Sequence, residues 1–325
     1  IASPRDSPTM SHRPPWSSLP LLIHEWVGEV LGAPVVTAIG QAGGFSPASA
    51  DRVVAANGQR AFVKAVHVDQ NAFTTDMHRV EARVAAAFPR GLPAPTLLGC
   101  LDQDGWVALA FADIDGRHPQ IPWDADELEA TLRSLDELAA AVTPPPLPDL
   151  PDLPAVIRDD FDGWTRVAAD PPAEVAPWLT AHLPELTARA ATGVIALAGN
   201  TLVHTDIRAD NLLIDRDGRV WVVDWPWACR GAAWADALLL LASAVDHTNL
   251  ANIDVRVDLV LAEHGVSPQV GTDVLSGFVS FFVDAARLPD PAGLGPVQEH
   301  RRKRAAYTVP LLRKRIEAEA TGARS

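Results

Sequence analysis

Cysteine, tyrosine and long apolar stretches are scarce in this sequence. Its 325 residues include two cysteines and one tyrosine. Cys100 and Cys229 are too few for a disulfide framework and lie in apolar sequence, so we interpret them as buried free thiols in a reducing compartment, which predicts a cytoplasmic protein. The apolar stretch at 237–245 is far shorter than the roughly 18 residues that span a bilayer, so no transmembrane segment is expected.

Basic residues are also few relative to acidic ones. The chain has 27 Lys and Arg against 41 Asp and Glu, a formal net charge of -14 and a pI near 5.1. Such a surface repels nucleic acid and anionic membranes, which excludes both as main partners, whereas cationic small molecules remain compatible. Residues 1–20 are rich in Ser and Pro and lack a signal-peptide pattern, so we expect a disordered segment there. Nothing in the sequence indicates the oligomeric state.

The order of patterns predicts a β-rich part followed by a helical part, an α+β organisation. After an expected helix at 19–32, apolar β-type runs are joined by the turn signals Asn57-Gly58 and Asp104-Gly105, which predicts an antiparallel sheet. Residues 71–88 have helical spacing and would insert one helix between strands. From Trp123 onward the pattern is mainly helical, interrupted by the Pro-rich stretch 143–154 and a short β island at 201–225.

The β island contains "HTDIRADN" at 204–211 and ends with an aspartate in "VWVVDWPW". Asp206, Asn211 and Asp224 can converge there, and oxygen ligands of this kind suit Mg²⁺. Each residue alone also fits a turn residue that bonds its own backbone. The combined spacing favours a metal site with Asp206 left to face a hydroxyl nucleophile.

A glycine-rich stretch, "IGQAGGFSPASA", precedes the strand-like "RAFVKAV". Glycines between two strands let backbone amides approach phosphate oxygens, although a plain hairpin loop fits the stretch alone. Lys64 lies mid-strand among apolar residues, where an unpaired ammonium group is costly to bury. A phosphate and a carboxylate would stabilise it, and Glu81 on the following helix is the natural carboxylate partner.

Together these stretches resemble the aminoglycoside phosphotransferase family of small-molecule kinases, relatives of the protein kinases in fold. The resemblance covers about residues 30–315 and is carried by "GGFSPASADRVVAANGQRAFVKAV", "HRVEARVAAAFP", "ALAFADIDGR", "VHTDIRADNLLI" and "VWVVDWPWACRGAAWADALLLL". It implies a two-lobed protein-kinase-like fold: a disordered segment 1–20, a small antiparallel-sheet N-lobe at 21–112 with one inserted helix, and a larger, mainly helical C-lobe at 113–325.

The resemblance also implies a role for each candidate residue. ATP would be bound by the loop residues Gly43, Gly44, Phe45 and Ser46, by Lys64 at the α/β phosphates with Glu81 orienting it, and by backbone near Ala110 and Ala112 at the adenine. Asp206 would be the catalytic base, and Asn211 and Asp224 would hold Mg²⁺. His204 and Asp236 would have structural roles.

The sequence departs from the family pattern at several positions. Thr205 and Arg208 replace residues that are often Gly and His, and the role of Arg208 stays open between the transferring phosphoryl group and a bracing contact. Trp225-Pro226 replaces the Phe-Gly of protein kinases. Only nine residues separate Asp224 from the next helical stretch, which leaves little room to dock a peptide, so a small-molecule hydroxyl acceptor is favoured.

Charge gives a weaker indication of the acceptor. Residues 113–162 contain thirteen Asp or Glu against three Arg and no Lys, which would attract a cationic acceptor such as an aminoglycoside, although a plain solvated acidic surface also fits. The expected function is therefore ATP-dependent phosphorylation of a hydroxyl group of a small molecule. One candidate acceptor is a cationic antibiotic, and phosphorylation of an antibiotic would confer resistance to it. A metabolic kinase for an amino alcohol, sugar or macrolide, and a non-catalytic nucleotide-binding regulatory protein, remain alternatives.

Overall fold

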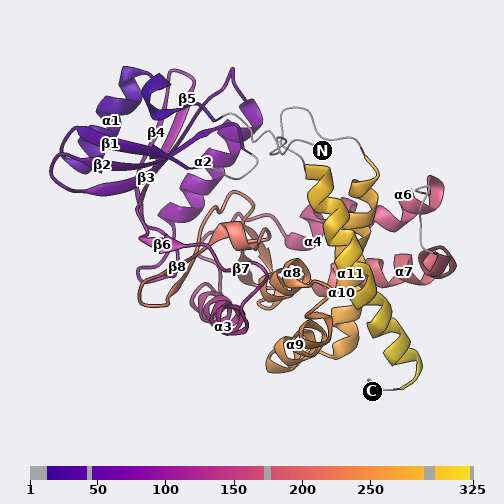
Figure 1. The fold of residues 1–325 in the computed structure, drawn as a ribbon. Helices are drawn as coiled ribbons and strands as arrows, with labels where there is room; N and C mark the ends of the chain where they lie inside the picture. The colour runs from indigo at the N-terminus through magenta and orange to yellow at the C-terminus, as the bar shows by residue number, and fades with distance from the viewer. Residues whose placement is uncertain (1–12, 42–45, 172–176, 289–296, 323–325) are drawn as a thin grey trace, which may run out of the picture. The chain divides into compact units, whose positions relative to one another are not determined.

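The computed structural model describes residues 13–41, 46–171, 177–288 and 297–322 (Figure 1). Within these ranges the chain forms two compact units. The sheet unit comprises the described residues up to Pro119 together with Asp210–Trp227, and the helical unit contains Gln120–Ala209 and most of the chain after Ala228. Asn211 and Asp224 therefore belong to the sheet unit, whereas we had expected them in the C-lobe beginning at residue 113.

The sheet unit is built on a five-stranded antiparallel sheet, as the hairpin signals predicted. Its strands are β1 (Val35–Gly40), β2 (Ser49–Ala55), β3 (Arg60–His67), β4 (Leu97–Gln103) and β5 (Trp106–Ala112), in the order β1-β2-β3-β5-β4. Gly58 and Gly105, at φ 85° and 81°, form the predicted turns between β2 and β3 and between β4 and β5.

Two helices cover the two faces of this sheet (Figure 1). Helix α1 (Leu21–Leu31) packs Ile23, Val27 and Leu31 against one face and ends at Gly32, whose φ of 72° makes it a left-handed C-cap. Helix α2 (Ala72–Ala86) is the predicted inserted helix and is capped by Asn71, whose Oδ1 accepts from the Thr74 amide at 2.8 Å.

The buried face of α2 differs from the apolar positions that indicated the helix. The apolar residue Phe73 is 60% exposed, whereas His78 and Glu81 are 5% and 2% exposed. Helical spacing therefore identified the helix correctly, and Val84 of the apolar stripe is fully buried, but the inner face also holds the polar side chains of His78 and Glu81. Glu81 points inward because Lys64 of the sheet pairs with it, as the candidate site shows.

A second, three-stranded sheet completes this unit. Strands β6 (Gly116–Arg117), β8 (Leu212–Asp215) and β9 (Val220–Val222) are antiparallel in the order β6-β8-β9, and the 3-10 turn η2 (Ala209–Asn211) precedes β8. A tight turn at 215–218 joins β8 to β9, with Gly218 at φ 79° and its amide bonded to the Asp215 carbonyl at 3.1 Å. This turn brings Asn211 and Asp224 to neighbouring strand ends.

The helical unit is organised around α10 (Pro268–Ala286). This helix packs against α5 (Arg158–Phe161), α6 (Gly163–Ala169), α7 (Pro177–Ala196), α8 (Ala235–Ala244) and α9 (Leu250–Glu263). Gly193 of α7 lies so close to the Asp273 backbone that a Cβ would collide with it, which explains the small residue there. The other elements are α3 (Ala125–Ala141), α4 (Leu153–Val156), α11 (Val297–Ala320) and the pair β7 (Thr201–Val203) and β10 (Cys229–Gly231).

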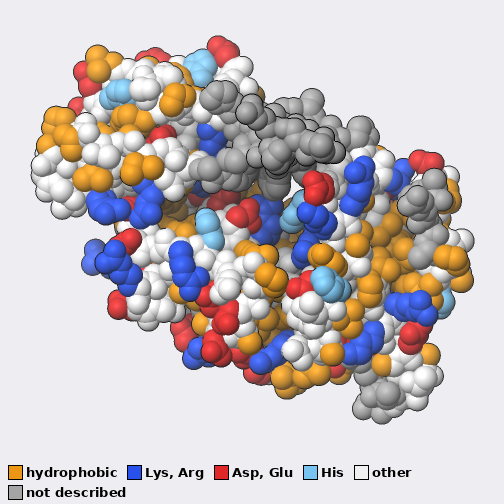
Figure 2. Space-filling model, viewed as in Figure 1, with side chains coloured by type: hydrophobic (Ala, Val, Ile, Leu, Met, Phe, Trp, Pro, Cys, Tyr) orange, Lys and Arg blue, Asp and Glu red, His pale blue; other side chains and the backbone are white. Residues whose placement is uncertain are grey.

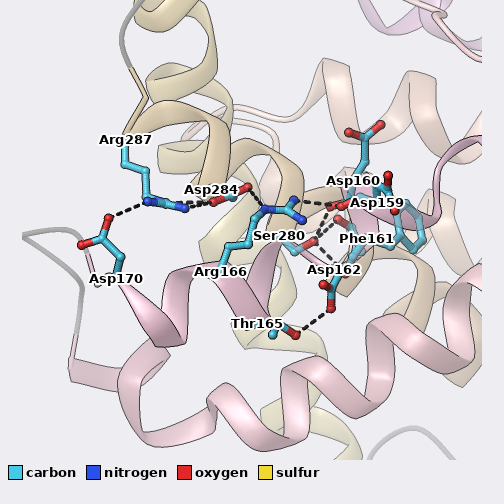
Figure 3. Close-up of polar contacts among 11 residues, drawn as sticks. Asp159, Asp160, Phe161, Asp162, Thr165, Arg166, Asp170, Ser280, Asp284 and Arg287 are labelled. Carbon is cyan, nitrogen blue, oxygen red and sulfur yellow. Dashed lines mark hydrogen bonds and ion pairs between the residues drawn. The ribbon is translucent and has the colours of Figure 1, made fainter.

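Ion pairs reinforce the contact between α6 and α10 (Figure 3). Arg166 donates to Asp284 at 2.6 Å, and Arg287 bridges Asp284 and Asp170 at 2.7 and 2.8 Å. The buried Trp164 adds a hydrogen bond from its indole nitrogen to the Ser276 carbonyl at 2.9 Å. None of the helices in the described ranges is both long and apolar enough to cross a membrane.

Three expectations differ from the structure. Cys229 is buried, but Cys100 is exposed, because it lies on the edge strand β4. Ordered structure begins before residue 21: the 3-10 turn η1 (Trp16–Ser18) and the buried Leu19 fall within the segment that we expected to be disordered. The Pro-rich stretch already turns helical at Leu153, because Pro154 occupies the first turn of α4, where its missing N–H is not needed.

Candidate active site

The glycine-rich loop lies between β1 and β2. Gly43, Gly44 and Phe45 fall outside the described residues, so their predicted phosphate contacts remain predictions. Ser46 is described, and its Oγ accepts a hydrogen bond from the Ala48 amide at 3.2 Å. This bond shapes the entry into β2.

Lys64 lies in the middle of β3, paired with Ala50 of β2 and Leu109 of β5. Its Nζ donates to both carboxylate oxygens of Glu81 at 2.8 Å and to Oδ1 of Asp224 at 2.6 Å. The Lys64 side chain is 13% exposed and that of Glu81 3%, whereas that of Asp224 is 42% exposed. Strand, inserted helix and second sheet thus bring three charged groups together within one unit.

The charges of this triad do not cancel. Burial lowers the pKa of Lys64, but the carboxylates of Asp224 and Glu81 outweigh burial, so its pKa is raised and the ammonium stays charged. Burial raises the pKa of Glu81, and the Lys64 ammonium opposes that rise. Two carboxylates thus share the Lys64 ammonium, and the Arg13 guanidinium also interacts electrostatically with Asp224, whose side chain reaches solvent. Because Asp224 is exposed, its carboxylate is accessible to a metal ion.

Asp224 and Asn211 are the residues predicted to hold a metal ion. Asp224 follows β9 with φ 70°, an uncommon conformation for a non-glycine residue. The Val223 amide donates to the Asn211 carbonyl at 3.0 Å, so the two strand ends are joined beside the triad. Among the described residues, no group of three or more His, Cys, Asp or Glu could hold a metal by itself. The donor set fits a hard cation that takes its remaining ligands from water and phosphate.

The residue after Asp224 faces α2 as well. The Trp225 amide donates to Glu81 Oε1 at 3.4 Å, and its indole nitrogen donates to the Val222 carbonyl at 3.0 Å. Trp225 is 2% exposed, and its ring meets Phe88 edge-on with 4.9 Å between centroids. Sequence reasoning missed these contacts, because no local signal links residues so far apart in the chain.

Asp206 belongs to the helical unit, in the loop that follows β7. The buried carboxylate of Asp236 accepts the His204 amide at 2.7 Å and the Thr205 amide at 2.9 Å. The His204 ring in turn accepts the Asp206 amide at 3.2 Å through Nδ1. Asp236 and His204 therefore brace the loop, in agreement with the structural roles that the resemblance implied.

Thr205 is the β-branched residue in this loop with a left-handed backbone, at φ 69°. The family often has Gly at this position, and a residue without Cβ adopts this conformation without strain. The two amide bonds to Asp236 hold Thr205 in place despite that cost.

Arg208 and Asp206 form an ion pair within the helical unit. Nη2 of Arg208 lies 3.7 Å from Oδ2 of Asp206, and the two side chains are 23% and 32% exposed. This contact fits a bracing role for Arg208.

The pairing of the sheet strands restricts which backbone groups near Ala110 and Ala112 could contact adenine. Ala110 is fully buried between its neighbours Val63 and Gly99, and the Ala112 amide already donates to the Thr96 carbonyl at 2.8 Å. Adenine binding near Ala110 and Ala112 stays a prediction, and it would have to use other backbone groups than the Ala112 amide.

The acidic stretch 113–162 is partly neutralised. Asp113 is nearly buried and pairs with Arg52 and Arg60 at 2.7 and 2.8 Å, so it is not offered to solvent. In the space-filling view, acidic side chains are visible over α3 (Figure 2). The exposed acids of this helix and its cap are Asp124, Asp126, Asp136 and Glu137.

Comparisons with known proteins identify the family and the fold of this chain. A model of the phosphotransferase enzyme family matches residues 42–264, while the sequence has no significant match among curated proteins. An aminoglycoside phosphotransferase from Alicyclobacillus acidocaldarius superposes with a TM-score of 0.55 at 15% identity, covering 86% of this chain and 92% of that chain.

Two further structures have the same fold. Spectinomycin phosphotransferase APH(9)-Ia, solved with ADP and spectinomycin, has a TM-score of 0.57 at 12% identity and covers 90% of this chain and 97% of its own. Macrolide 2′-phosphotransferase MphH from Brachybacterium faecium has a TM-score of 0.56 at 17% identity and covers 88% and 96%. The two-lobed, kinase-like α+β fold is thereby established. Since the family model spans more than half of the sequence, the chain belongs to the phosphotransferase enzyme family, whose members transfer phosphoryl groups to alcohol groups.

Proposed function

We propose that this protein transfers the γ-phosphoryl group of ATP to a hydroxyl group of a small cationic molecule, an aminoglycoside being the leading candidate. The observation that carries the proposal is the triad of Lys64, Glu81 and Asp224, with Lys64 held between two carboxylates within 2.8 Å. Similar folds have been solved with ADP or AMP-PNP, which supports ATP as the donor. We expect the protein to act in the cytoplasm, with nucleotide binding in residues 21–112 and acceptor binding in 113–325.

Phosphoryl transfer depends mainly on positioning and charge stabilisation. In the proposed reaction Lys64 holds the α/β phosphates, Glu81 orients Lys64, and the loop amides of Gly43 and Gly44 contact phosphate oxygens. Bound Mg²⁺, held by Asp224 and Asn211, would neutralise phosphate charge. Asp206 aligns the acceptor hydroxyl and accepts its proton, while Arg208 braces the Asp206 side chain through their ion pair.

Support for a cationic acceptor comes from charge. The exposed acids of α3 and its cap attract a cation, and similar folds have been solved in complex with hygromycin B and with spectinomycin. A macrolide 2′-phosphotransferase has the same fold at a comparable TM-score, so a macrolide acceptor is the second candidate. An amino alcohol or sugar acceptor is the metabolic alternative.

The test is acceptor-dependent ADP release with ATP and Mg²⁺, measured against separate panels of aminoglycosides, macrolides, amino alcohols and neutral polyols. Phosphorylated product would be verified by mass spectrometry. We expect turnover with one class of cationic acceptor. In Asp206→Asn, kcat should fall by about 10²- to 10⁴-fold while the affinity for AMP-PNP is retained. Asp217→Asn, an exposed aspartate in the β8–β9 turn, is the matched control.

The outcomes separate the alternatives. Turnover only with macrolides or amino alcohols would replace the acceptor assignment and keep the kinase chemistry. Intact AMP-PNP binding with no acceptor-dependent release from any panel would favour the non-catalytic nucleotide-binding role. Undiminished turnover in Asp206→Asn would remove Asp206 from the chemistry.

A further inference from the structure

Two of the three residues after Asp224, Trp225 and Trp227, contact the two ends of helix α2. Trp225 meets Phe88, two residues beyond the helix, with ring centroids 4.9 Å apart and an interplanar angle of 73°. Trp227 meets Phe73, in the first turn of α2, with centroids 5.9 Å apart at 45°. Aromatic pairs in such offset or edge-to-face arrangements are attractive beyond their buried area.

The two contacts differ in burial. Trp225 is 2% exposed and is fixed by its hydrogen bond to the Val222 carbonyl, so it forms a rigid anchor. Trp227 and Phe73 are 43% and 60% exposed, so a large part of each side chain lies outside the core. Pro226, whose ring fixes φ, joins the two tryptophans and limits how far Trp227 can move from the anchor.

Glu81 lies between the two aromatic contacts, so these contacts affect its position. Glu81 is eight residues after Phe73 and seven before Phe88, near the middle of α2. Its 2.8 Å bonds to Lys64 would break if α2 moved by about 1 Å, because hydrogen bonds weaken steeply with distance. A helix tied at both ends to the segment that carries Asp224 keeps Glu81 and Asp224 at fixed places around Lys64.

We propose that Phe73 and Trp227 are positioning residues of the active site. Their ring contact fixes the N-terminal end of α2 relative to Asp224 and keeps Lys64 between its two carboxylates before a nucleotide binds. The proposal rests on the proposed function in that Lys64 and Asp224 serve the nucleotide. It also explains how nine residues after Asp224 suffice to hold the triad assembled.

The test combines two readouts on the full chain. Hydrogen exchange of residues 72–86, followed by mass spectrometry without nucleotide or metal, reports on α2, and calorimetry gives the Kd of AMP-PNP with Mg²⁺. We expect Trp227→Ala and Phe73→Ala each to speed exchange in α2 and to raise the Kd by about two- to tenfold. The double variant should equal the single variants, because both remove one contact.

Two variants serve as controls. Trp227→Phe keeps an aromatic ring and should restore both readouts to near the wild-type values. Leu98→Ala alters a residue of β4 that is 41% exposed, close to the exposure of Trp227, and should change neither readout.

Other results would overturn the proposal. Unchanged exchange and Kd in both alanine variants, or effects that add in the double variant, would show that the rings do not act as a pair. A raised KM for the acceptor alone, with exchange and nucleotide affinity unchanged, would make the rings an acceptor platform. Failure of wild-type turnover would count against the proposed function only, because exchange is measured without substrates.

Discussion

The ammonium of Lys64 lies 2.6 Å from Oδ1 of Asp224, closer than to either oxygen of Glu81. The cation expected to bind phosphates is thus also bonded to the carboxylate expected to bind a metal. Nucleotide and metal binding would redistribute these bonds, since Asp224 is 42% exposed and Glu81 only 3%. Glu81 is the partner that can hold Lys64 throughout.

Replacing Glu81 by Gln should therefore weaken the use of ATP. Lys64 would lose its buried partner and be drawn to Asp224, where it competes with the metal. A hydrogen bond to a charged group contributes about 1.5–3 kcal/mol, so kcat/KM for ATP should fall by about 10- to 100-fold and more Mg²⁺ should be needed. Glu317→Gln removes an exposed ion pair with Arg313 and serves as the control. Unchanged kcat/KM in Glu81→Gln would contradict the orienting role.

Thr205→Gly should stabilise the protein. The left-handed backbone at φ 69° strains a residue with a branched Cβ, and glycine removes that strain, so we expect the free energy of unfolding to rise by about 1 kcal/mol. Urea unfolding measures the change. Thr205→Ala also lacks the hydroxyl group but keeps Cβ, and it should show no such gain. A less stable glycine variant would mean that the threonine side chain contributes more than the strain costs.

His78 should make stability depend on pH. Burial, and then the nearby charge of Lys64, lower the pKa of this imidazole from its ordinary 6.5 to about 3. The folded state favours the neutral form, so its contribution is fully present above about pH 6.5 and is lost as pH falls from there toward 3. Between pH 7 and pH 5 the free energy of unfolding should fall by about 2 kcal/mol more in the wild type than in His78→Gln.

Urea unfolding at the two pH values measures this difference. His247→Gln, at an exposed position, should leave the wild-type pH dependence intact. Parallel pH profiles for the wild type and His78→Gln would show that His78 does not stay neutral in the folded protein.

Arg315 should be among the most sensitive positions for stability. Its side chain is fully buried and donates to Asp254 at 2.9 Å, to Asp258 at 2.7 Å and to the Thr272 hydroxyl at 3.1 Å. Arg315→Met would remove the buried guanidinium that these three groups share and should cost about 3 kcal/mol in urea unfolding. Arg313→Met, two positions away in an exposed pair with Glu317, should change stability by less than about 0.5 kcal/mol. Equal effects of the two variants would contradict this role.

Sequence patterns predicted the structure best where the signal depends on residues close together in the chain. The turns at Gly58, Gly105 and Gly218 and the C-cap at Gly32 all have the positive φ that their sequence context indicates. The inserted helix follows from its spacing, and its partnership with Lys64 follows from the order of elements. These features depend on backbone sterics and on neighbours close in the chain.

Contacts across long separations were not predictable in this way. The spacing of apolar residues placed Phe73 on the helix stripe, yet Phe73 is exposed and the inner face of α2 holds Glu81, because Lys64 lies opposite and pairs with it. The exposure of Cys100 follows from the position of β4 at the edge of the sheet. The residues of a single strand do not determine the order of strands in a sheet.

By itself, the sequence determined which groups could do chemistry: a lysine that must find a carboxylate, a loop with Asp206, and oxygen donors at Asn211 and Asp224. Only the tertiary structure decided that Asp224 bonds Lys64, that Asn211 and Asp224 belong to the sheet unit, and that Trp225 and Trp227 tie both ends of α2 to Asp224. The reason is that side-chain charge and backbone preference act locally, whereas the pairing of residues 160 positions apart depends on how strands and helices pack.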